Sequence, residues 1–312
     1  MDTPLNILFW IAVIPVTIAL GLCATWIVRK VSALVQWRVG PPLLQPCYDV
    51  MKLLGKEILI PEQAHQGVFT AAPVIGFASV LLLSIMFWRI GVTQKAFAGD
   101  IIVAIYLMVL PSLALIMGGS ASGSPHASLG TSREMKLVMA YELPLILAFI
   151  VVIIKSGGVL QLSRIAGLEH APVLSISGAL AFLVSLMCIQ AKLGYIPFDM
   201  AEAETELASG ILMEYSGALL AVWKLMQATM LVALPMFLVT VFLGGFGPNL
   251  NGWLIGLGMY VLVLVLIILI KNTNPRVRID QAMKFFWVYC FLILAIAVSL
   301  AIIGNTFKIY WL

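Results

Sequence analysis

The stretch that decides the fold is residues 216–243, SGALLAVWKLMQATMLVALPMFLVTVFL. It contains a single charged residue, Lys224, and it exceeds the ~20 mostly apolar residues that a helix needs to cross a bilayer. Similar runs recur along the 312-residue chain, which is 62% hydrophobic and only 10% charged. A soluble domain has about 25% charged residues. We therefore expect an all-α integral membrane protein, since the runs are too long and continuous for barrel strands.

Eight transmembrane helices are predicted, and together they form a single transmembrane domain over residues 1–312. Their approximate ranges are 5–28, 68–88, 101–119, 137–155, 173–195, 216–243, 252–270 and 285–304. No internal repeat is visible, and only short polar segments separate the helices. The first run begins at Leu5 without a basic segment before it, so we expect a retained helix rather than a signal peptide.

The distribution of Lys and Arg predicts the orientation of this multi-pass chain. Twelve of the 18 basic residues fall in one set of loops, five fall in the opposite loops and the C-terminal tail, and Lys224 lies within a helix. The richer side is expected to be cytoplasmic. Both termini would then lie outside the cell inner (plasma) membrane, and the loops at 29–67, 120–136, 196–215 and 271–284 would lie inside.

The first inner loop is predicted to contain a short amphipathic helix after Pro46. The apolar face would carry Cys47, Val50, Met51, Leu54 and Ile58, and the opposite face Asp49, Lys52 and Lys56. The helix is too short to span the membrane, so we expect it to lie flat at the inner interface. An ordinary connecting helix that rests on neighbouring spans would show the same pattern.

Acidic residues gather between the fifth and sixth predicted spans. They are Asp199, Glu202, Glu204, Glu206 and Glu214. If residues 199–214 formed one helix, all of them except Glu204 would lie within ~120° of one face. Crowding and burial both raise the proton affinity of carboxylates, which makes this cluster a candidate proton or ion path. Pro197 and Gly210 indicate a broken helix, and a solvated loop is the alternative.

Three further ionisable residues lie within or at the ends of spans. Glu142 is predicted to be a buried functional acid, with a hydrogen-bonded structural acid as the alternative. Lys224 is ~15 Å along its helix from Glu214, and we expect it to pair with a carboxylate because its depth hinders snorkelling. Lys192 lies near the inner end of the fifth span and is expected to snorkel to the interface.

No metal centre and no catalytic residue are expected on the chain itself. Its cysteines are Cys23, Cys47, Cys188 and Cys290, and its histidines are His65, His126 and His170; all are scattered, without a Cys-x-x-Cys pair. The net charge of +4 does not indicate nucleic-acid binding. If the protein belongs to a redox complex, the metals lie on partner chains.

Charged strings recur on the predicted inner side. Arg38 and Asp49 lie in the first inner loop, Arg133 and Glu134 in the second, and Arg276, Arg278 and Asp280 in the last. Taken singly they are ordinary positive-inside residues, and Arg278 and Asp280 could pair at a helix start. Further strings occur in the same order along the chain: RVGP at 38–41, LQP at 44–46, KLLGKE at 52–57, PFD at 197–199, EAETEL at 202–207, EYSG at 214–217, DQ at 280–281 and Trp287.

This ordered set resembles subunit 1 of respiratory complex I and its homologues in membrane-bound nickel–iron hydrogenases. The compact string GPPLLQP at 40–46, together with SGSP at 122–125 and GTSREM at 130–135, is similar to the energy-converting hydrogenase branch, which includes formate hydrogenlyase and Ech-type enzymes. The string NPR at 274–276 is closer to the Ech-type and complex I pattern.

The resemblance implies a non-redox membrane anchor and coupling subunit of an oxidoreductase. It would link ferredoxin-dependent hydrogen turnover in a peripheral arm to proton or sodium translocation. The implied partners are the hydrogenase large and small subunits, a ferredoxin-like iron–sulfur subunit, an antiporter-like membrane subunit and membrane lipids, with iron–sulfur clusters and the nickel–iron centre on those partners. The seven charged residues of the inner strings would contact the arm, and Glu142, the acidic cluster and Lys224 would form the coupling path.

Three other functions fit parts of the pattern. The chain could be the quinone-site subunit of a complex I-like NADH/quinone oxidoreductase, although the compact 40–46 string differs from the longer insertion usual there. It could be a freestanding secondary transporter, since intramembrane acids and broken helices also occur in that class, but the missing repeat argues against this. A passive anchor would not explain Glu142, Glu206, Glu214 and Lys224 together.

Overall fold

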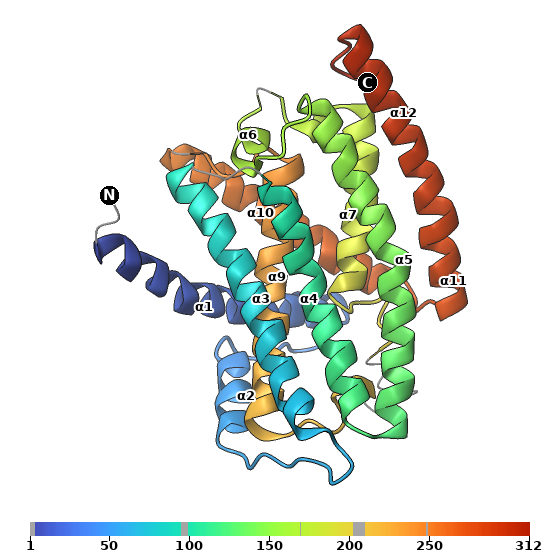
Figure 1. The fold of residues 1–312 in the computed structure, drawn as a ribbon. Coiled ribbons are helices and arrows are strands. Elements are labelled where there is room, and N and C mark those ends of the chain that lie inside the picture. The colour runs from blue at the N-terminus through green and yellow to red at the C-terminus, as the bar shows by residue number, and fades with distance from the viewer. Residues whose placement is uncertain (1–3, 95–98, 169, 202–209, 248) are drawn as a thin grey trace. The chain divides into compact units, whose positions relative to one another are not determined.

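The computed structural model describes the chain except residues 1–3, 95–98, 169, 202–209 and 248. The described part is helical throughout, without strands. Its long helices are α1 (Pro4–Val35), α3 (Gln66–Thr93), α4 (Asp100–Ala121), α5 (Pro125–Lys155), α7 (Ile176–Lys192), α9 (Gly217–Phe242), α10 (Leu250–Thr273) and α12 (Phe291–Phe307) (Figure 1). The short elements are α2 (Gln45–Leu54), α6 (Leu162–Ala166), α11 (Ile279–Lys284), the 3-10 turns η1 (Pro172–Leu174) and η2 (Gly210–Leu212), and the π-helix η3 (Phe285–Cys290).

The predicted all-α membrane fold is confirmed. Within the described residues, seven helices are long and apolar enough to cross a membrane, and the last of them, Ile279–Phe307, combines α11, η3 and α12. The fifth predicted span appears as α7, a shorter apolar helix of 17 residues. At 1.5 Å per residue it is ~25 Å long, at the lower end of what a spanning helix needs.

Five of the long helices contain an internal proline. These are Pro15, Pro73, Pro111, Pro144 and Pro235. Proline removes a backbone hydrogen bond, but membrane helices tolerate it because neighbouring helices and Ser or Thr side chains satisfy the backbone groups that are released. Pro144, two residues after Glu142, therefore does not end α5.

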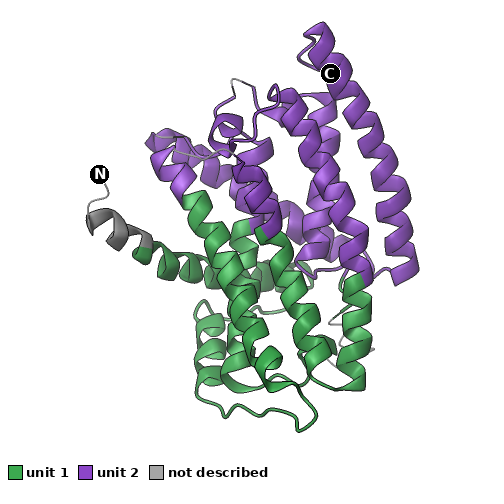
Figure 2. Cartoon of the chain, viewed as in Figure 1, with its two compact units in different colours: residues 1–88, 107–135, 199–233 green, residues 89–106, 136–198, 234–312 purple. Residues whose placement is uncertain are grey.

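The chain divides into two compact units (Figure 2). Unit 1 comprises residues 1–88, 107–135 and 199–233, and unit 2 comprises residues 89–106, 136–198 and 234–312. The long helices α3, α4, α5 and α9 contribute residues to both units. A single domain over 1–312 stays a prediction.

In unit 1, a close approach of two helices is set by a glycine. A Cβ placed on Gly21 of α1 would lie 2.7 Å from the carbonyl oxygen of Ala228 on α9, which is too close for any side chain. Small residues of this kind let membrane helices pack backbone against backbone. Nearby in α9, Trp223 is fully buried, so this part of the helix belongs to the core of unit 1.

Unit 2 is organised around α7 and α12, which pack against one another. The start of α7 is covered by the end of the chain: the Ile176 N–H donates to the Trp311 carbonyl at 3.0 Å, and the Ser177 N–H donates to Leu312 at 3.3 Å. The first N–H groups of a helix have no partner within the helix, and here backbone oxygens of the C-terminal segment supply one.

Candidate functional site

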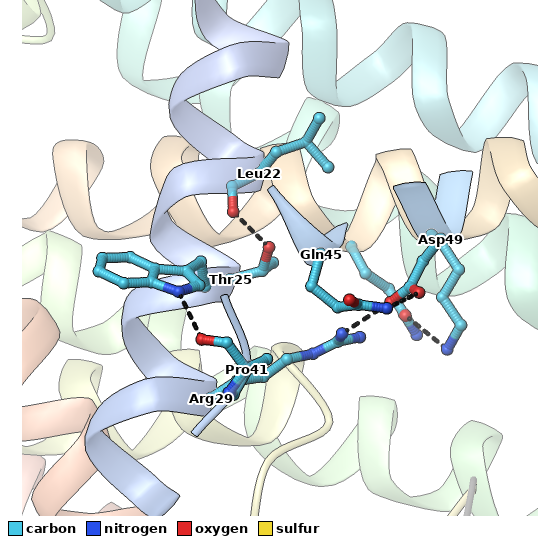
Figure 3. Close-up of polar contacts among 9 residues, drawn as sticks. Leu22, Thr25, Arg29, Pro41, Gln45 and Asp49 are labelled. Atoms are coloured by element: carbon cyan, nitrogen blue, oxygen red, sulfur yellow. Dashed lines mark hydrogen bonds and ion pairs between the residues drawn. The ribbon is translucent and has the colours of Figure 1, made fainter. Parts of the chain in front are cut away.

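The first inner segment is held to α1 by a polar cluster in unit 1 (Figure 3). The Arg29 guanidinium donates to Asp49 at 2.9 Å, and the Gln45 amide donates to the other oxygen of the same carboxylate at 3.0 Å. The indole N–H of Trp26 donates to the Pro41 carbonyl at 3.1 Å. Burial alone would raise the pKa of Asp49, but these two hydrogen bonds and the nearby positive charges hold that pKa below its ordinary value. Asp49, predicted as an arm contact, therefore anchors α2 to α1.

The predicted amphipathic helix exists as α2, but most of its apolar face is uncovered. Val50 is buried, whereas Met51, Leu54 and the following Ile58 are exposed. Ahead of α2, Trp37 and Val39 are 97% and 98% exposed on either side of the predicted contact residue Arg38. Exposed apolar surface of this extent marks a membrane or protein contact. The flat position at the inner interface stays a prediction.

The end of the acidic segment is tied to this first inner segment within unit 1. The Leu59 N–H donates to the Ser216 hydroxyl at 2.8 Å. Tyr215 donates to the Phe69 carbonyl at 3.1 Å and stacks on the Phe69 ring at 4.1 Å, and burial raises the pKa of this tyrosine. These contacts fix the backbone beside Glu214, which is itself half-buried.

The second inner segment packs against the same acidic segment. A Cβ on Gly130, in the first turns of α5, would lie 3.0 Å from the Ala201 carbonyl and 3.1 Å from the Ile211 N–H. The predicted contact residues that follow are Glu134, which is buried, and Arg133, which is half-buried. Unit 1 therefore brings together three of the four loops predicted to be cytoplasmic.

Residues 199–214 do not form one helix where the structure describes them, in agreement with the break that Pro197 and Gly210 indicated. Asp199 lies in irregular backbone, Gly210 begins a 3-10 turn with a φ of +52°, and Glu214 lies in a turn. The break follows from the residues themselves, since Pro197 and a glycine with positive φ both interrupt a helix. Glu202, Glu204 and Glu206 lie outside the described residues, so the shared acidic face remains untested.

In unit 2 the structure brings Glu142 and Lys192 together. The Lys192 ammonium on α7 forms an ion pair and hydrogen bond with the Glu142 carboxylate on α5, across 50 residues of sequence. The Lys192 side chain is fully buried and that of Glu142 is 15% exposed. The expectation that Lys192 snorkels to the interface is therefore wrong, because a buried carboxylate is within its reach.

An aromatic cluster of unit 2 lies on the lysine side of this ion pair. The Lys192 ammonium lies 5.1 Å from the centre of the buried Tyr141 ring, and Tyr141 meets the edge of Phe286 at 6.3 Å. Phe286 in turn packs on Phe198 at 4.8 Å. Phe286 belongs to η3, and π-helical turns of this kind are frequent at functional sites.

Also within unit 2, the last inner segment contacts the loop after α7. The Val277 N–H donates to the Pro197 carbonyl at 3.1 Å, and the buried Gln190 amide donates to the Ile196 carbonyl at 2.7 Å. The Lys271 ammonium lies 4.4 Å from the centre of the Tyr195 ring. The predicted contact residues Arg278 and Asp280 are exposed beside this junction, and Arg276 is half-buried.

Lys224 is half-buried in unit 1, where its ammonium donates to the Gln227 side chain at 3.3 Å. The predicted carboxylate partner stays a prediction, because the central acids of the cluster are not described. A single path through Glu142, Glu206, Glu214 and Lys224 likewise stays a prediction. Among the described residues, no three His, Cys, Asp or Glu side chains form a group that could hold a metal ion.

Sequence reasoning placed Glu142 in the site but missed its partner and the aromatic surroundings. A signal for the pair was available. The fourth predicted span begins and the fifth ends on the inner side, and Glu142 and Lys192 each lie a few residues inside those ends. The sequence contains no comparable signal for the π-helix, because its residues have the apolar pattern of the start of the last predicted span.

Fold and site together define a class: a multi-pass helical membrane protein with a buried lysine–glutamate pair and charged inner segments. Comparison with known proteins gives the family. The chain matches the family described as NADH dehydrogenase over residues 7–302. It therefore belongs to the family of complex I subunit 1, which includes the corresponding membrane subunits of bacterial NADH-quinone oxidoreductases.

Relatives of similar length support this assignment. The chain is 35% identical over 269 residues to the corresponding NADH-quinone oxidoreductase subunit of Thermomicrobium roseum, which covers 77% of this chain and 79% of the relative. It is 33% identical over 258 residues to the equivalent subunit of Dehalococcoides mccartyi strain CBDB1, which covers 79% of this chain and 70% of the relative.

A solved structure agrees in fold along almost the whole chain. It is a chain of the membrane-bound sulfane sulfur reductase, described as an archaeal respiratory membrane complex. The TM-score is 0.84 at 27% identity, covering 95% of this chain and 97% of that chain.

Proposed function

We propose that this chain is the membrane subunit through which a complex I-like respiratory complex couples electron transfer in a peripheral arm to ion movement across the membrane. The family membership supports the assembly, and the buried Lys192–Glu142 pair is the observation that carries the coupling role. An apolar protein has little reason to keep a largely buried ion pair for stability alone, because well-packed apolar residues serve as well or better.

The pair can act as a two-state charge element. With Glu142 ionised, the lysine ammonium is neutralised at close range. A proton that arrives on Glu142 removes that neutralisation and takes the negative charge away from a fully buried ammonium, which is strongly unfavourable. The lysine must then release its own proton or change its contacts. Proton arrival on one side chain thereby drives a change on the other.

The electron acceptor of the complex distinguishes two versions of this function. The names of the curated relatives favour the quinone oxidoreductase version over the energy-converting hydrogenase version that the sequence strings suggested. We therefore place the quinone version first. The exposed, apolar segment that contains Trp37 and Val39 is compatible with an apolar substrate or with docking of the arm.

A quinone-independent complex is the second candidate. The compact 40–46 string favours it, and so does the close match in length and fold to the sulfane sulfur reductase chain. The purified complex should be assayed with NADH or reduced ferredoxin as donor and with a short-chain quinone, protons or a sulfane sulfur compound as acceptor. Quinone reduction that a quinone-site inhibitor abolishes supports the first version, and turnover with the other acceptors alone supports the second.

The coupling role itself is tested by Glu142→Gln in the whole complex reconstituted in vesicles. We expect the rate of ion uptake to fall at least about tenfold, equivalent to ~1.4 kcal/mol in activation free energy, while electron transfer within the peripheral arm to an artificial acceptor is retained. Glu62→Gln is the matched control, because it removes a carboxylate from an exposed position. If Glu142→Gln assembles and translocates ions at the rate of the control, the coupling role is wrong.

A further inference from the structure

A cavity of about 420 Å3 opens in unit 2 beside the end of α12. Its volume lies within the ~300–1,000 Å3 typical of small-molecule sites. The polar side chains around it are Lys155, His170, Ser175, Asn305 and Lys308, and its aromatic side chains are Tyr310 and Trp311. The remaining lining residues are apolar or glycine.

The charged side chains among the described lining residues, Lys155 and Lys308, are both cationic. Lys155 ends α5, and Lys308 follows α12 with a left-handed φ of +55° that turns the chain back over the cavity. His170 packs edge-on against Tyr310, with 4.9 Å between ring centres. No carboxylate occurs among the lining residues that the structure describes. The cavity is therefore suited to an anion.

The start of α7, next to the cavity, does not supply the positive potential. Its N–H groups at Ile176 and Ser177 already donate to the carbonyls of Trp311 and Leu312. The Lys155 ammonium lies 3.5 Å from the Tyr310 carbonyl, at the outer limit of a hydrogen bond, which leaves its other donors available. The side-chain cations are thus the groups that can contact a ligand.

The surroundings of the cavity match a membrane–water interface. Tyr310 and Trp311 are 68% and 63% exposed, and aromatic residues of this kind are enriched at the level of lipid headgroups. On α12, Ile303 and Phe307 are exposed apolar side chains that flank the residues lining the cavity. An acyl chain could follow that apolar surface while a headgroup occupied the cavity.

The charge distribution of the whole chain gives an independent argument. Only five Lys and Arg residues fall on the predicted outer side, where basic residues are disfavoured, and two of those five line this one cavity. Snorkelling would explain one lysine at a helix end. It does not explain the convergence of two, from helices far apart in the sequence of unit 2, together with a histidine.

We propose that this cavity binds the phosphate group of an anionic phospholipid headgroup, with Lys155 and Lys308 as the contacting cations and His170 as a hydrogen-bond donor. The proposal concerns a lipid site whose nearest residue in the sequence, Lys155, is ~20 Å along α5 from Glu142, and it does not rest on the proposed function. A bound lipid here would link the C-terminal segment, α5 and the loop before α7.

The test is retention of lipid by the full chain. Protein is exchanged into nanodiscs of phosphatidylcholine, titrated with phosphatidylglycerol, and the lipids that remain bound after extraction are counted by native mass spectrometry. We compare the wild type, Lys155→Gln/Lys308→Gln, and Lys155→Arg/Lys308→Arg, which keeps both charges. Arg164→Gln is the matched control, because it removes one exposed cation of the same predicted side that does not line the cavity.

We expect one tightly retained phosphatidylglycerol in the wild type, the arginine variant and the control, and at least tenfold weaker retention in the glutamine variant. A parallel arm offers inorganic phosphate without phosphatidylglycerol and measures protection of Lys155 from amine-reactive labelling. Protection by phosphate without lipid retention would overturn the lipid assignment and give the same cavity to a soluble phosphate compound. Equal lipid retention in all four proteins, with no protection of Lys155 by phosphate or phosphatidylglycerol in the wild type and the Arg164→Gln control, would overturn the proposal altogether.

Discussion

Replacing each partner of the Glu142–Lys192 pair by an apolar residue of similar size should destabilise the protein unequally. Glu142→Leu leaves an ammonium whose side chain is fully buried, and we expect a loss of ~3–5 kcal/mol in the free energy of unfolding. Lys192→Met leaves a carboxylate that is 15% exposed and keeps some contact with water, so its cost should lie below that range.

The double variant Glu142→Leu/Lys192→Met should recover most of the stability. Removal of both charges leaves no unpaired ion, and exchange of a buried ion pair for packed apolar residues is often neutral or stabilising. The measurement is unfolding in mixed micelles with increasing dodecyl sulfate, followed by tryptophan fluorescence and circular dichroism. The coupling energy between the two sites should therefore reach ~3 kcal/mol or more, because the double variant avoids most of the cost of each single change.

Lys155→Gln provides the matched control for this cycle. It removes a lysine from the same helix as Glu142, 13 residues or ~20 Å further along, and its effect should add to that of Glu142→Leu within ~0.5 kcal/mol. The reasoning fails if Glu142→Leu and Lys192→Met are also additive, or if Lys192→Met is the more damaging of the two.

Three further predictions concern the inner segments, the topology and the metals. Arg29→Gln or Asp49→Asn should speed hydrogen exchange at α2 while lowering global stability by well under ~1 kcal/mol, because the pair is largely exposed and screened. The folded-state pKa of Asp49 is lowered, so the stabilisation that its carboxylate provides is present in full above pH 3.8 and is lost as pH falls below that value. Equal hydrogen exchange at α2 in the wild type and the variants would contradict the predicted role of the pair. Cysteines introduced at positions 128 and 308 should be labelled from opposite sides of the membrane, and labelling from one side would refute the predicted orientation. The purified chain alone should contain no stoichiometric iron or nickel by elemental analysis, and stoichiometric metal in the folded chain would contradict this.

The membrane class and the positions of the long helices follow from the sequence, because both depend on local composition. A run such as 216–243 has no alternative in a bilayer to a helix that satisfies its own backbone groups. The short helix α2 also follows from local spacing. The break between Asp199 and Glu214 follows from local residues as well, because Pro197 and Gly210 both interrupt a helix.

The tertiary structure decided which charged side chains meet. Glu142 and Lys192 are 50 residues apart, so no local pattern links them, and snorkelling was the natural expectation for a lysine near a helix end. The tertiary structure of unit 2 placed a carboxylate of α5 within reach of this lysine on α7 and the Tyr141 ring beside its ammonium. The anion-suited cavity likewise exists only because the C-terminal segment folds back onto the start of α7. Composition determines that a helix lies in the bilayer rather than in water, whereas contacts between helices determine which side chain pairs with each buried charge.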